Sequence, residues 1–232
     1  MSRALFLASL ALAFNLAHAA HDSPAAHSPS VAEVRATLAA MPKGNAARGK
    51  QLNQSLMCAS CHGNEGVAPT SNWASLAGQR AAYTYKSLLD YQKNGRHENA
   101  RATVMQAAVS GMSRQDMADV AAWYASLPAP NPAPVRLDAA AHTRIDRLVR
   151  RGDPTRLLTA CASCHGAAGQ GGINETPALA GQTVGSFVRT MNDYRQGHRV
   201  TDANQGMRQF AQRLSAQEIR ALALYYAALP KP

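Results

Sequence analysis

Several kinds of residue and pattern are scarce in this chain of 232 residues. Its four cysteines form two close pairs, so none is left over for structural disulfides elsewhere. After the N-terminal stretch, no apolar run approaches the roughly 20 residues that a membrane-spanning helix needs. No segment alternates polar and apolar residues as a half-buried strand would, and the sequence therefore predicts an all-α protein.

Acidic side chains are also few, with 14 Asp and Glu against 24 Lys and Arg, for a formal net charge of +10. A basic surface favours acidic protein partners or anionic lipid headgroups, and it raises encounter rates at low salt. The arginines are scattered and are not grouped with aromatic residues that could stack on bases, which disfavours a nucleic-acid partner. We therefore expect acidic proteins as partners, with association at a membrane surface as a further option.

The four cysteines lie in two identical motifs, Cys58-Ala-Ser-Cys61-His62 and Cys161-Ala-Ser-Cys164-His165. Two thiols at this spacing add to the vinyl groups of a porphyrin while the adjacent imidazole reaches the iron, so each motif predicts one covalently bound haem c. The alternatives are a zinc site, whose two cysteine pairs would have to converge, and a redox dithiol, which needs only one pair. Neither alternative requires a histidine after each pair.

The repeat divides the chain, because Cys161 lies 103 residues after Cys58. We predict a signal peptide over residues 1–19 and an N-terminal extension over 20–44 that contains a short amphipathic helix. The first haem domain is expected over 45–128 and the second over 136–232. A proline-rich linker over 129–135 joins them.

The signal peptide is predicted from Arg3, an apolar run of about 13 residues and an Ala17-His18-Ala19 cleavage box. A retained membrane anchor is the alternative, but the apolar run is short for a bilayer that needs about 20 residues. We therefore expect an exported protein, which agrees with the attachment of haem c outside the cytoplasm in bacteria.

Each half ends in an amphipathic helix that begins with a capping box. Ser113 with Asp116 predicts the first of these helices, and Ser215 with Glu218 predicts the second. The helix of the extension is expected to pack on the first domain, with contact to a partner protein as the alternative.

The second axial position of each iron decides whether such a protein carries electrons or reacts with a small molecule. Met105 lies 43 residues after His62, and Met207 lies 42 residues after His165, with a one-residue deletion between Tyr194 and Met207. We therefore predict that His62 and Met105 bind one iron and that His165 and Met207 bind the other. A thioether is a soft ligand that favours ferrous iron and raises the potential.

Other histidines and methionines are possible rivals as ligands. His97 and His198 do not occupy matching positions in the two halves and are interpreted as exposed loop residues. The remaining methionines of the two halves are interpreted as core residues, and three histidines lie outside the haem-binding units: Met57, Met112, Met117 and Met191; His21, His27 and His142.

The carbonyl of Pro177 is placed to accept a hydrogen bond from the ring N–H of His165, which would fix the imidazole and strengthen its donation to iron. Ala74 stands at the equivalent place in the first half. Its carbonyl can serve in the same way, without the rigid proline backbone.

These residues resemble the di-haem cytochromes c4, and the resemblance covers about residues 49–229. It rests on the two haem motifs, the two methionines, and two further pairs of matching stretches: Leu-Ala-Gly-Gln at 76–79 and 179–182, and the Tyr-to-Arg stretches at 91–96 and 194–199. The resemblance implies two tandem class I cytochrome c domains whose haem propionates meet near the domain interface.

It also implies a periplasmic electron carrier, a monomer or weak dimer, and not an enzyme. Such a carrier takes electrons from quinol-oxidising complexes or dehydrogenases and passes them to a terminal oxidase or reductase. Two alternatives stay open. One is the cytochrome subunit of an exported dehydrogenase that oxidises sulfide or an alcohol. The other is a di-haem enzyme such as a peroxidase or a thiosulfate-oxidising protein, which would need an open or unusual axial position.

Overall fold

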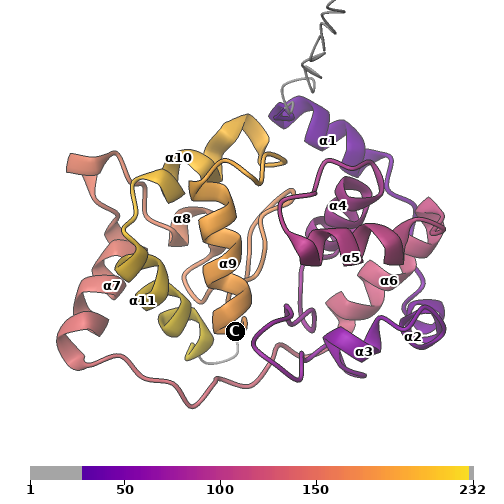
Figure 1. The fold of residues 1–232 in the computed structure, drawn as a ribbon, viewed down its shortest axis with the longest axis horizontal. Helices are drawn as coiled ribbons and strands as arrows, with labels where there is room; N and C mark the ends of the chain where they lie inside the picture. Colours follow the sequence, from indigo (N-terminus) through magenta and orange to yellow (C-terminus); the bar gives the residue numbers. More distant parts are fainter. Residues whose placement is uncertain (1–27, 230–232) are drawn as a thin grey trace, which may run out of the picture.

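The computed structural model describes residues 28–229, and the predicted signal peptide lies outside them. Within this range the chain is helical and contains no strand; its one β-bridge joins Asp153 to Leu158. Figure 1 shows two groups of helices side by side, one from each half of the sequence. The fold is thus all-α, as predicted. None of the helices in the described range is long and apolar enough to cross a membrane.

The first group of helices packs around α6, which contacts both α2 and α4, while α4 also contacts α5. Its apolar core includes Tyr85, Met117 and Tyr124, all of which are almost fully buried. The helices of this group are α2 (Ala46–Ser55), α3 (Ala59–His62), α4 (Ala81–Gln92), α5 (Ala100–Val109) and α6 (Arg114–Ser126).

The second group repeats this arrangement around α9 and α11, which contact each other, while α7 contacts α11 and α10 contacts α9. It has an apolar core of its own, which includes Ile219, Leu222 and Tyr226. Its elements are α7 (Ala139–Arg151), η1 (Pro154–Arg156), α8 (Ala162–His165), α9 (Val184–Arg195), η2 (Ala203–Gln205), α10 (Gly206–Gln212) and α11 (Ala216–Ala227). Two separate cores mean two domains, for which we propose the boundaries predicted from the sequence.

Both predicted capping boxes are present. The Ser113 hydroxyl accepts a hydrogen bond from the backbone N–H of Asp116, whose carboxylate accepts one from the Ser113 N–H; Ser215 and Glu218 do the same at the start of α11. These reciprocal bonds satisfy N–H groups that the first turn of a helix leaves without partners. They fix where the two central helices begin.

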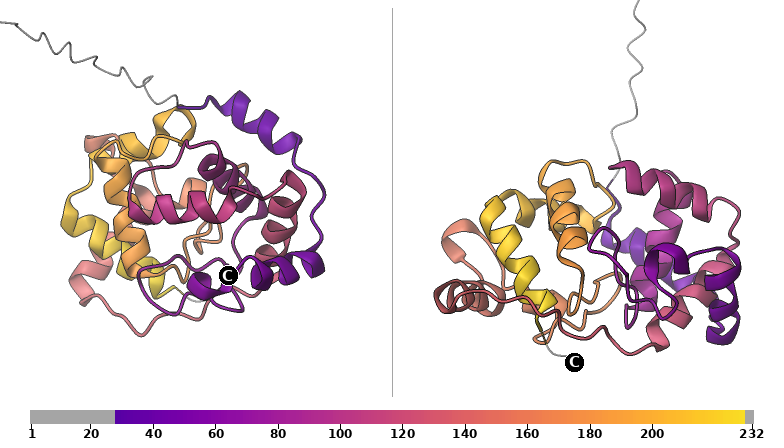
Figure 2. Two further views of the ribbon diagram at one scale, coloured as in Figure 1. Left: turned by 45° about the vertical axis from the view of Figure 1, so that its right-hand side comes forward. Right: turned by 60° about the horizontal axis from the view of Figure 1, so that its bottom comes forward.

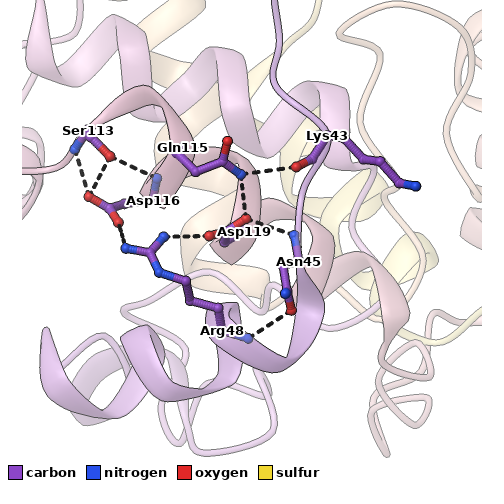
Figure 3. A network of polar contacts seen from close by, with 7 residues as sticks. All are labelled: Lys43, Asn45, Arg48, Ser113, Gln115, Asp116 and Asp119. Carbon is purple, nitrogen blue, oxygen red and sulfur yellow. Dashed lines mark hydrogen bonds and ion pairs between the residues drawn. The ribbon is translucent and has the colours of Figure 1, made fainter.

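A polar network fastens the start of α2 to α6 (Figure 3). The buried carboxylate of Asp119 accepts hydrogen bonds from the Asn45 backbone N–H at 2.7 Å, from the Gln115 amide at 2.8 Å, and from the Arg48 guanidinium. Arg48 also pairs with Asp116, so one arginine links α2 to two successive turns of α6. The network holds the two helices at close range.

The N-terminal extension contributes α1 (Val31–Ala39), whose capping box joins Ser30 to Glu33. Val34 is 2% exposed, and α1 contacts both α4 of the first domain and η2 of the second. The backbone N–H of Asn204 donates to the Pro29 carbonyl at 2.9 Å. Figure 2 shows α1 beside the turn that leads into α10. The helix packs on the first domain, as expected, and it also contacts the second domain.

The crossing of α2 and α6 predicts a large effect of one added methyl group. A Cβ atom on Gly49 would lie 2.0 Å from the Asp119 carbonyl oxygen and 2.7 Å from the Cβ of Trp123, and both groups belong to α6. Gly49→Ala should therefore destabilise the first domain by about 3 kcal/mol, as overpacked helix contacts do. Thermal unfolding followed by circular dichroism measures the loss.

Gly111→Ala is the matched control, because a Cβ there has no atom within 4 Å. It should change the stability by less than about 0.5 kcal/mol. Equal effects of the two substitutions would contradict the close approach of α2 to α6.

Candidate functional site

Each cysteine motif folds into a single helical turn. The backbone N–H of His62 donates to the Cys58 carbonyl at 3.0 Å, and that of His165 donates to the Cys161 carbonyl at 2.9 Å. Residues three and four apart share one face of a helix, so both cysteines and the histidine of a motif point to the same side. Gly63, with a φ of +80°, ends the turn in a backbone conformation that other residues rarely adopt.

Both motif histidines are buried, with 7% of each residue exposed. The Nδ1–H of His62 donates to the Ala74 carbonyl at 2.8 Å, and that of His165 donates to the Pro177 carbonyl at 3.0 Å. The Pro177 contact predicted from the sequence is thus present, and alanine replaces proline in the first domain without loss of the bond. With Nδ1 engaged, each ring has only Nε2 left for another ligand, and Nε2 of His62 has no hydrogen-bond partner.

Burial lowers the pKa of His62 and of His165 below the usual range, while the hydrogen bond to a backbone carbonyl acts in the opposite direction. A lowered pKa keeps the imidazole neutral at ordinary pH. A neutral imidazole has the free lone pair that binds a metal ion.

A cavity of about 470 Å³ extends through both domains, and we call it the shared cavity. Apolar side chains such as Leu88, Phe187 and Leu222 form much of its wall. All but one of the predicted cofactor-binding residues also line it, and the exception, Cys61, lies on the same helical turn as Cys58: the lining residues are Cys58, His62, Met105, Cys161, Cys164, His165 and Met207.

The two predicted methionine ligands reach the shared cavity from corresponding but unequal elements. Met105 lies within the ten-residue α5, whereas Met207 lies at the start of the seven-residue α10. The turn η2 stands in place of the first turn of α5, and its Asn204 has a left-handed φ of +49°. The predicted one-residue deletion is absorbed there.

The rival histidines lie away from the shared cavity, whereas two of the rival methionines line it. His97 and His198 are exposed and do not line the shared cavity. Of the methionines interpreted as core residues, Met112, Met117 and Met191 are buried, and Met112 and Met191 also line the shared cavity. Met57 is 71% exposed, so its assignment to the core was wrong; its backbone has a left-handed φ of +57°, which turns the chain into the first motif.

Comparison with known proteins decides the family. The family described as "Cytochrome C oxidase, cbb3-type, subunit III" matches residues 44–123 and 156–225. Cytochrome c4 of Thiocapsa roseopersicina is 34% identical over 175 residues, which cover 75% of this chain and 87% of the relative. The chain belongs to the cytochrome c4 family. It is accordingly a di-haem electron-transfer cytochrome with two covalently bound haem c groups in two tandem cytochrome domains.

Two further cytochrome relatives agree with this assignment. The crystal structure of reduced recombinant cytochrome c4 from Pseudomonas stutzeri superposes with a TM-score of 0.72 at 30% identity, covering 80% of this chain and 99% of that one. A protein named "Thiosulfate dehydrogenase electron acceptor" from Stutzerimonas stutzeri (strain A1501) is 34% identical over 173 residues, which cover 74% of this chain and 78% of the relative.

The residues of this cytochrome c4 chain fit the haems that the family implies. A haem is a flat apolar body with one anionic edge, and the shared cavity combines apolar walls with buried cationic side chains. The buried Nε2 of His62 has no hydrogen-bond partner within the chain, so its lone pair is free to bind iron. Haem iron supplies reversible one-electron chemistry, while the chain positions the haem and shields it from water.

Two buried arginines in the wall of the shared cavity were not assigned a role from the sequence. Arg96 and Arg199 are 8% and 4% exposed, and their guanidinium groups lie over the rings of Tyr91 and Tyr194 at 4.1 and 4.6 Å. The repeated Tyr-to-Arg stretch was the sequence signal for these two arginines. A buried charge needs a counter-charge, and Glu98 supplies one to Arg96 at 2.6 Å. Nε of Arg199 has no partner within the chain, which fits an anionic group of the cofactor beside it.

The positive charge of the two arginines affects the pKa of Tyr83, which also lines the shared cavity. Burial alone would raise the pKa of its hydroxyl, but the charges of Arg199 and Arg96 lower that pKa to about 8. Nη2 of Arg199 lies 3.4 Å from the Tyr83 hydroxyl. The same field favours binding of haem carboxylates at this place.

Because the haem completes each small core, loss of its attachment should unfold the domain. Replacing Cys58 and Cys61 together by serine is expected to leave one haem on the chain, which the intact mass reports. The first domain should then lose its cooperative thermal transition in circular dichroism.

Ser60→Ala is the control, because it changes the same motif and keeps both thiols; it should retain two haems and both transitions. A first domain that still unfolds cooperatively without its haem would contradict the role assigned to the shared cavity.

Proposed function

We propose that this protein is a periplasmic electron carrier that receives electrons from a quinol-oxidising complex or a dehydrogenase and delivers them to a terminal oxidase or reductase. One observation carries the proposal: each domain presents to the shared cavity its motif histidine and, at matching distances along the chain, Met105 or Met207, while Met112 and Met191 also line it. If His62 and Met105 bind one iron, and His165 and Met207 the other, no axial position stays open for a substrate. Such a haem exchanges electrons and does no chemistry on a small molecule.

The predicted signal peptide over residues 1–19 supports the periplasmic location, and covalent haem attachment outside the bacterial cytoplasm agrees with it. We propose a monomer or weak dimer as the working form. The internal symmetry of two haem domains in one chain already supplies two redox centres to each molecule.

An alternative is that the protein serves as the cytochrome subunit of an exported dehydrogenase. The relative named as an electron acceptor of thiosulfate dehydrogenase favours a dehydrogenase as the donor. The two functions share the same haem sites and differ in the tightness of binding to the donor. Co-purification of a catalytic subunit in stoichiometric amount would favour the subunit role, and isolation of the cytochrome alone would favour the mobile carrier.

The basic surface proposed to meet an acidic partner is concentrated on α7. This helix exposes four arginines, while its opposite side buries Leu148, which lines the shared cavity. Positive charge therefore lies on the outside of a helix that walls the second haem pocket, where a docked partner would be near the porphyrin. The exposed arginines are Arg144, Arg147, Arg150 and Arg151, of which Arg150 pairs with Asp146 at 2.7 Å.

The proposed iron ligation predicts different effects for two methionines of the first domain. Met105→Leu keeps the side-chain volume but removes the thioether, so the potential of the first haem should fall and its ferric iron should bind added imidazole or cyanide. Visible spectra during a redox titration measure both effects, and Met207→Leu should do the same at the second haem.

Met117→Leu is the control, because Met117 is fully buried and does not line the shared cavity. It should leave both potentials unchanged. Unaltered titration of Met105→Leu and Met207→Leu would refute the assigned ligands and would reopen the possibility of a di-haem enzyme.

Charge reversal on α7 should slow electron transfer with an acidic redox protein such as a flavodoxin. Arg144→Glu combined with Arg147→Glu is expected to lower the second-order rate constant by about tenfold at low salt, as loss of electrostatic steering does. The difference should vanish as the Debye length shrinks to about 3 Å near 1 M salt. Stopped-flow absorbance measures the rates.

Arg35→Glu combined with Lys43→Glu makes the same change in net charge on the other side of the molecule, where α1 lies in Figure 1. This control should slow the reaction much less. Equal slowing by both variants, or a rate independent of salt, would exclude α7 as the docking surface.

A further inference from the structure

The two domains meet through a reciprocal pair of glutamines, one from each Leu-Ala-Gly-Gln repeat. The Gln182 amide spans the interface to Ser75: its Nε2 donates to the Ser75 carbonyl at 3.1 Å, and its Oε1 accepts from the Ser75 N–H at 2.9 Å. Gln79 makes the same pair of contacts with Ala178, at 3.0 and 2.8 Å. Ser75 and Ala178 occupy equivalent positions, so the interface has an approximate two-fold symmetry within one chain.

The peptide groups that donate hydrogen bonds to these glutamines also accept hydrogen bonds from the histidines proposed to bind iron. The peptide between Ala74 and Ser75 accepts the Nδ1–H of His62 at its carbonyl, while its N–H donates to Gln182 of the other domain. A continuous hydrogen-bonded chain therefore runs from the imidazole of the first domain through one peptide into the second domain.

The mirror chain runs in the opposite direction across the interface. The peptide between Pro177 and Ala178 accepts the Nδ1–H of His165 at its carbonyl, and its N–H donates to Gln79 of the first domain. Each histidine is thus linked to the glutamine of the other domain.

Both glutamines are held firmly in place. Gln79 is 4% exposed, and its Oε1 also accepts the N–H of Arg80 at 2.9 Å, as Oε1 of Gln182 accepts the N–H of Thr183 at 3.0 Å. The glycine that precedes Gln79 donates its N–H to the Tyr124 carbonyl of α6 at 2.9 Å, which anchors the corner to the core of its own domain. A rigid side chain transmits an interaction that a mobile one would average out.

A hydrogen bond accepted from a peptide N–H polarises that peptide and makes its carbonyl a better acceptor. A carbonyl that is a better acceptor forms a stronger hydrogen bond with the imidazole Nδ1–H, which raises the basicity of Nε2, the nitrogen that would bind the metal. A more basic imidazole stabilises ferric iron relative to ferrous iron. Removal of the glutamine should therefore weaken the chain and raise the potential of the haem in the opposite domain.

We propose that Gln182 is a positioning residue for the first haem and Gln79 for the second, so that each domain tunes the redox potential of the other. The inference rests on the proposed ligation of iron by His62 and His165. The effect is crossed: a substitution of the glutamine in one domain changes the redox potential of the haem in the other domain.

The test compares Gln182→Met and Gln79→Met in the full-length protein with both haems attached. Gln182→Met should raise the midpoint potential of the first haem and leave the second unchanged, and Gln79→Met should do the reverse. Redox titration followed by NMR reports the haems separately, with their signals assigned from Met105→Leu, which alters the first alone. In the reduced protein, the Nδ1–H resonance of His62 should also move upfield in Gln182→Met, as expected for a weaker hydrogen bond.

Thr183→Val is the matched control, because it removes another bond between the domains, from the Thr183 hydroxyl to the Trp73 carbonyl at 2.6 Å. It keeps the 2.9 Å bond from the Ser75 N–H to Gln182 Oε1, with which the Thr183 hydroxyl has only a 3.5 Å contact. Its potentials should equal those of the unsubstituted protein. Unchanged potentials in both glutamine variants, a shift in the domain that carries the substitution, or an equal shift in Thr183→Val would each overturn the proposal.

A variant whose domains separate would shift both haems together, and that result also contradicts a crossed effect. Failure of the iron ligation is seen independently, in the absorption spectrum of the unsubstituted protein, where the band of methionine-bound ferric haem would be missing. If the methionine band is present but the glutamine variants do not shift the potential of the haem in the opposite domain, the role of the glutamines is refuted. The proposed iron ligands are then unaffected.

Discussion

The hydrogen bond from each imidazole Nδ1–H to a backbone carbonyl is the interaction on which the haem sites depend. This bond fixes the plane of the ring and selects the tautomer with a proton on Nδ1. It leaves Nε2 of His62 without a hydrogen-bond partner in the chain. Burial adds a second constraint, because a buried imidazole stays neutral and so remains able to bind metal. Around this contact, two small helical cores are arranged that a flat apolar cofactor completes.

The charges near the cavity follow from the same geometry. An apolar pocket for a haem must also receive the two carboxylates of the porphyrin, and buried arginines are a costly feature unless an anion lies beside them. Arg96 and Arg199 are held against tyrosine rings, which orient their guanidinium groups through cation–π contact before any cofactor arrives. The site is thus preorganised for a ligand with one apolar face and one anionic edge.

Much of this architecture could be predicted from the sequence, because the decisive signals are local. The spacing in Cys58-Ala-Ser-Cys61-His62 matches one helical turn, the capping boxes fix where α6 and α11 begin, and the repeat places Met105 and Met207 in corresponding regions. Non-local features were missed. The exposure of Met57 depends on a left-handed turn, and the contacts of Gln79 and Gln182 depend on how two domains dock, which periodicity within either half does not specify.

The position of α1 against both domains has a consequence for how the molecule folds. This helix precedes the first domain in the chain, yet part of the surface that it covers belongs to the turn before α10, near the other end of the sequence. A polypeptide that is synthesised from its N-terminus supplies α1 before η2, which follows more than 160 residues later. The contacts of α1 with η2 can therefore form only after the second half of the chain has been made.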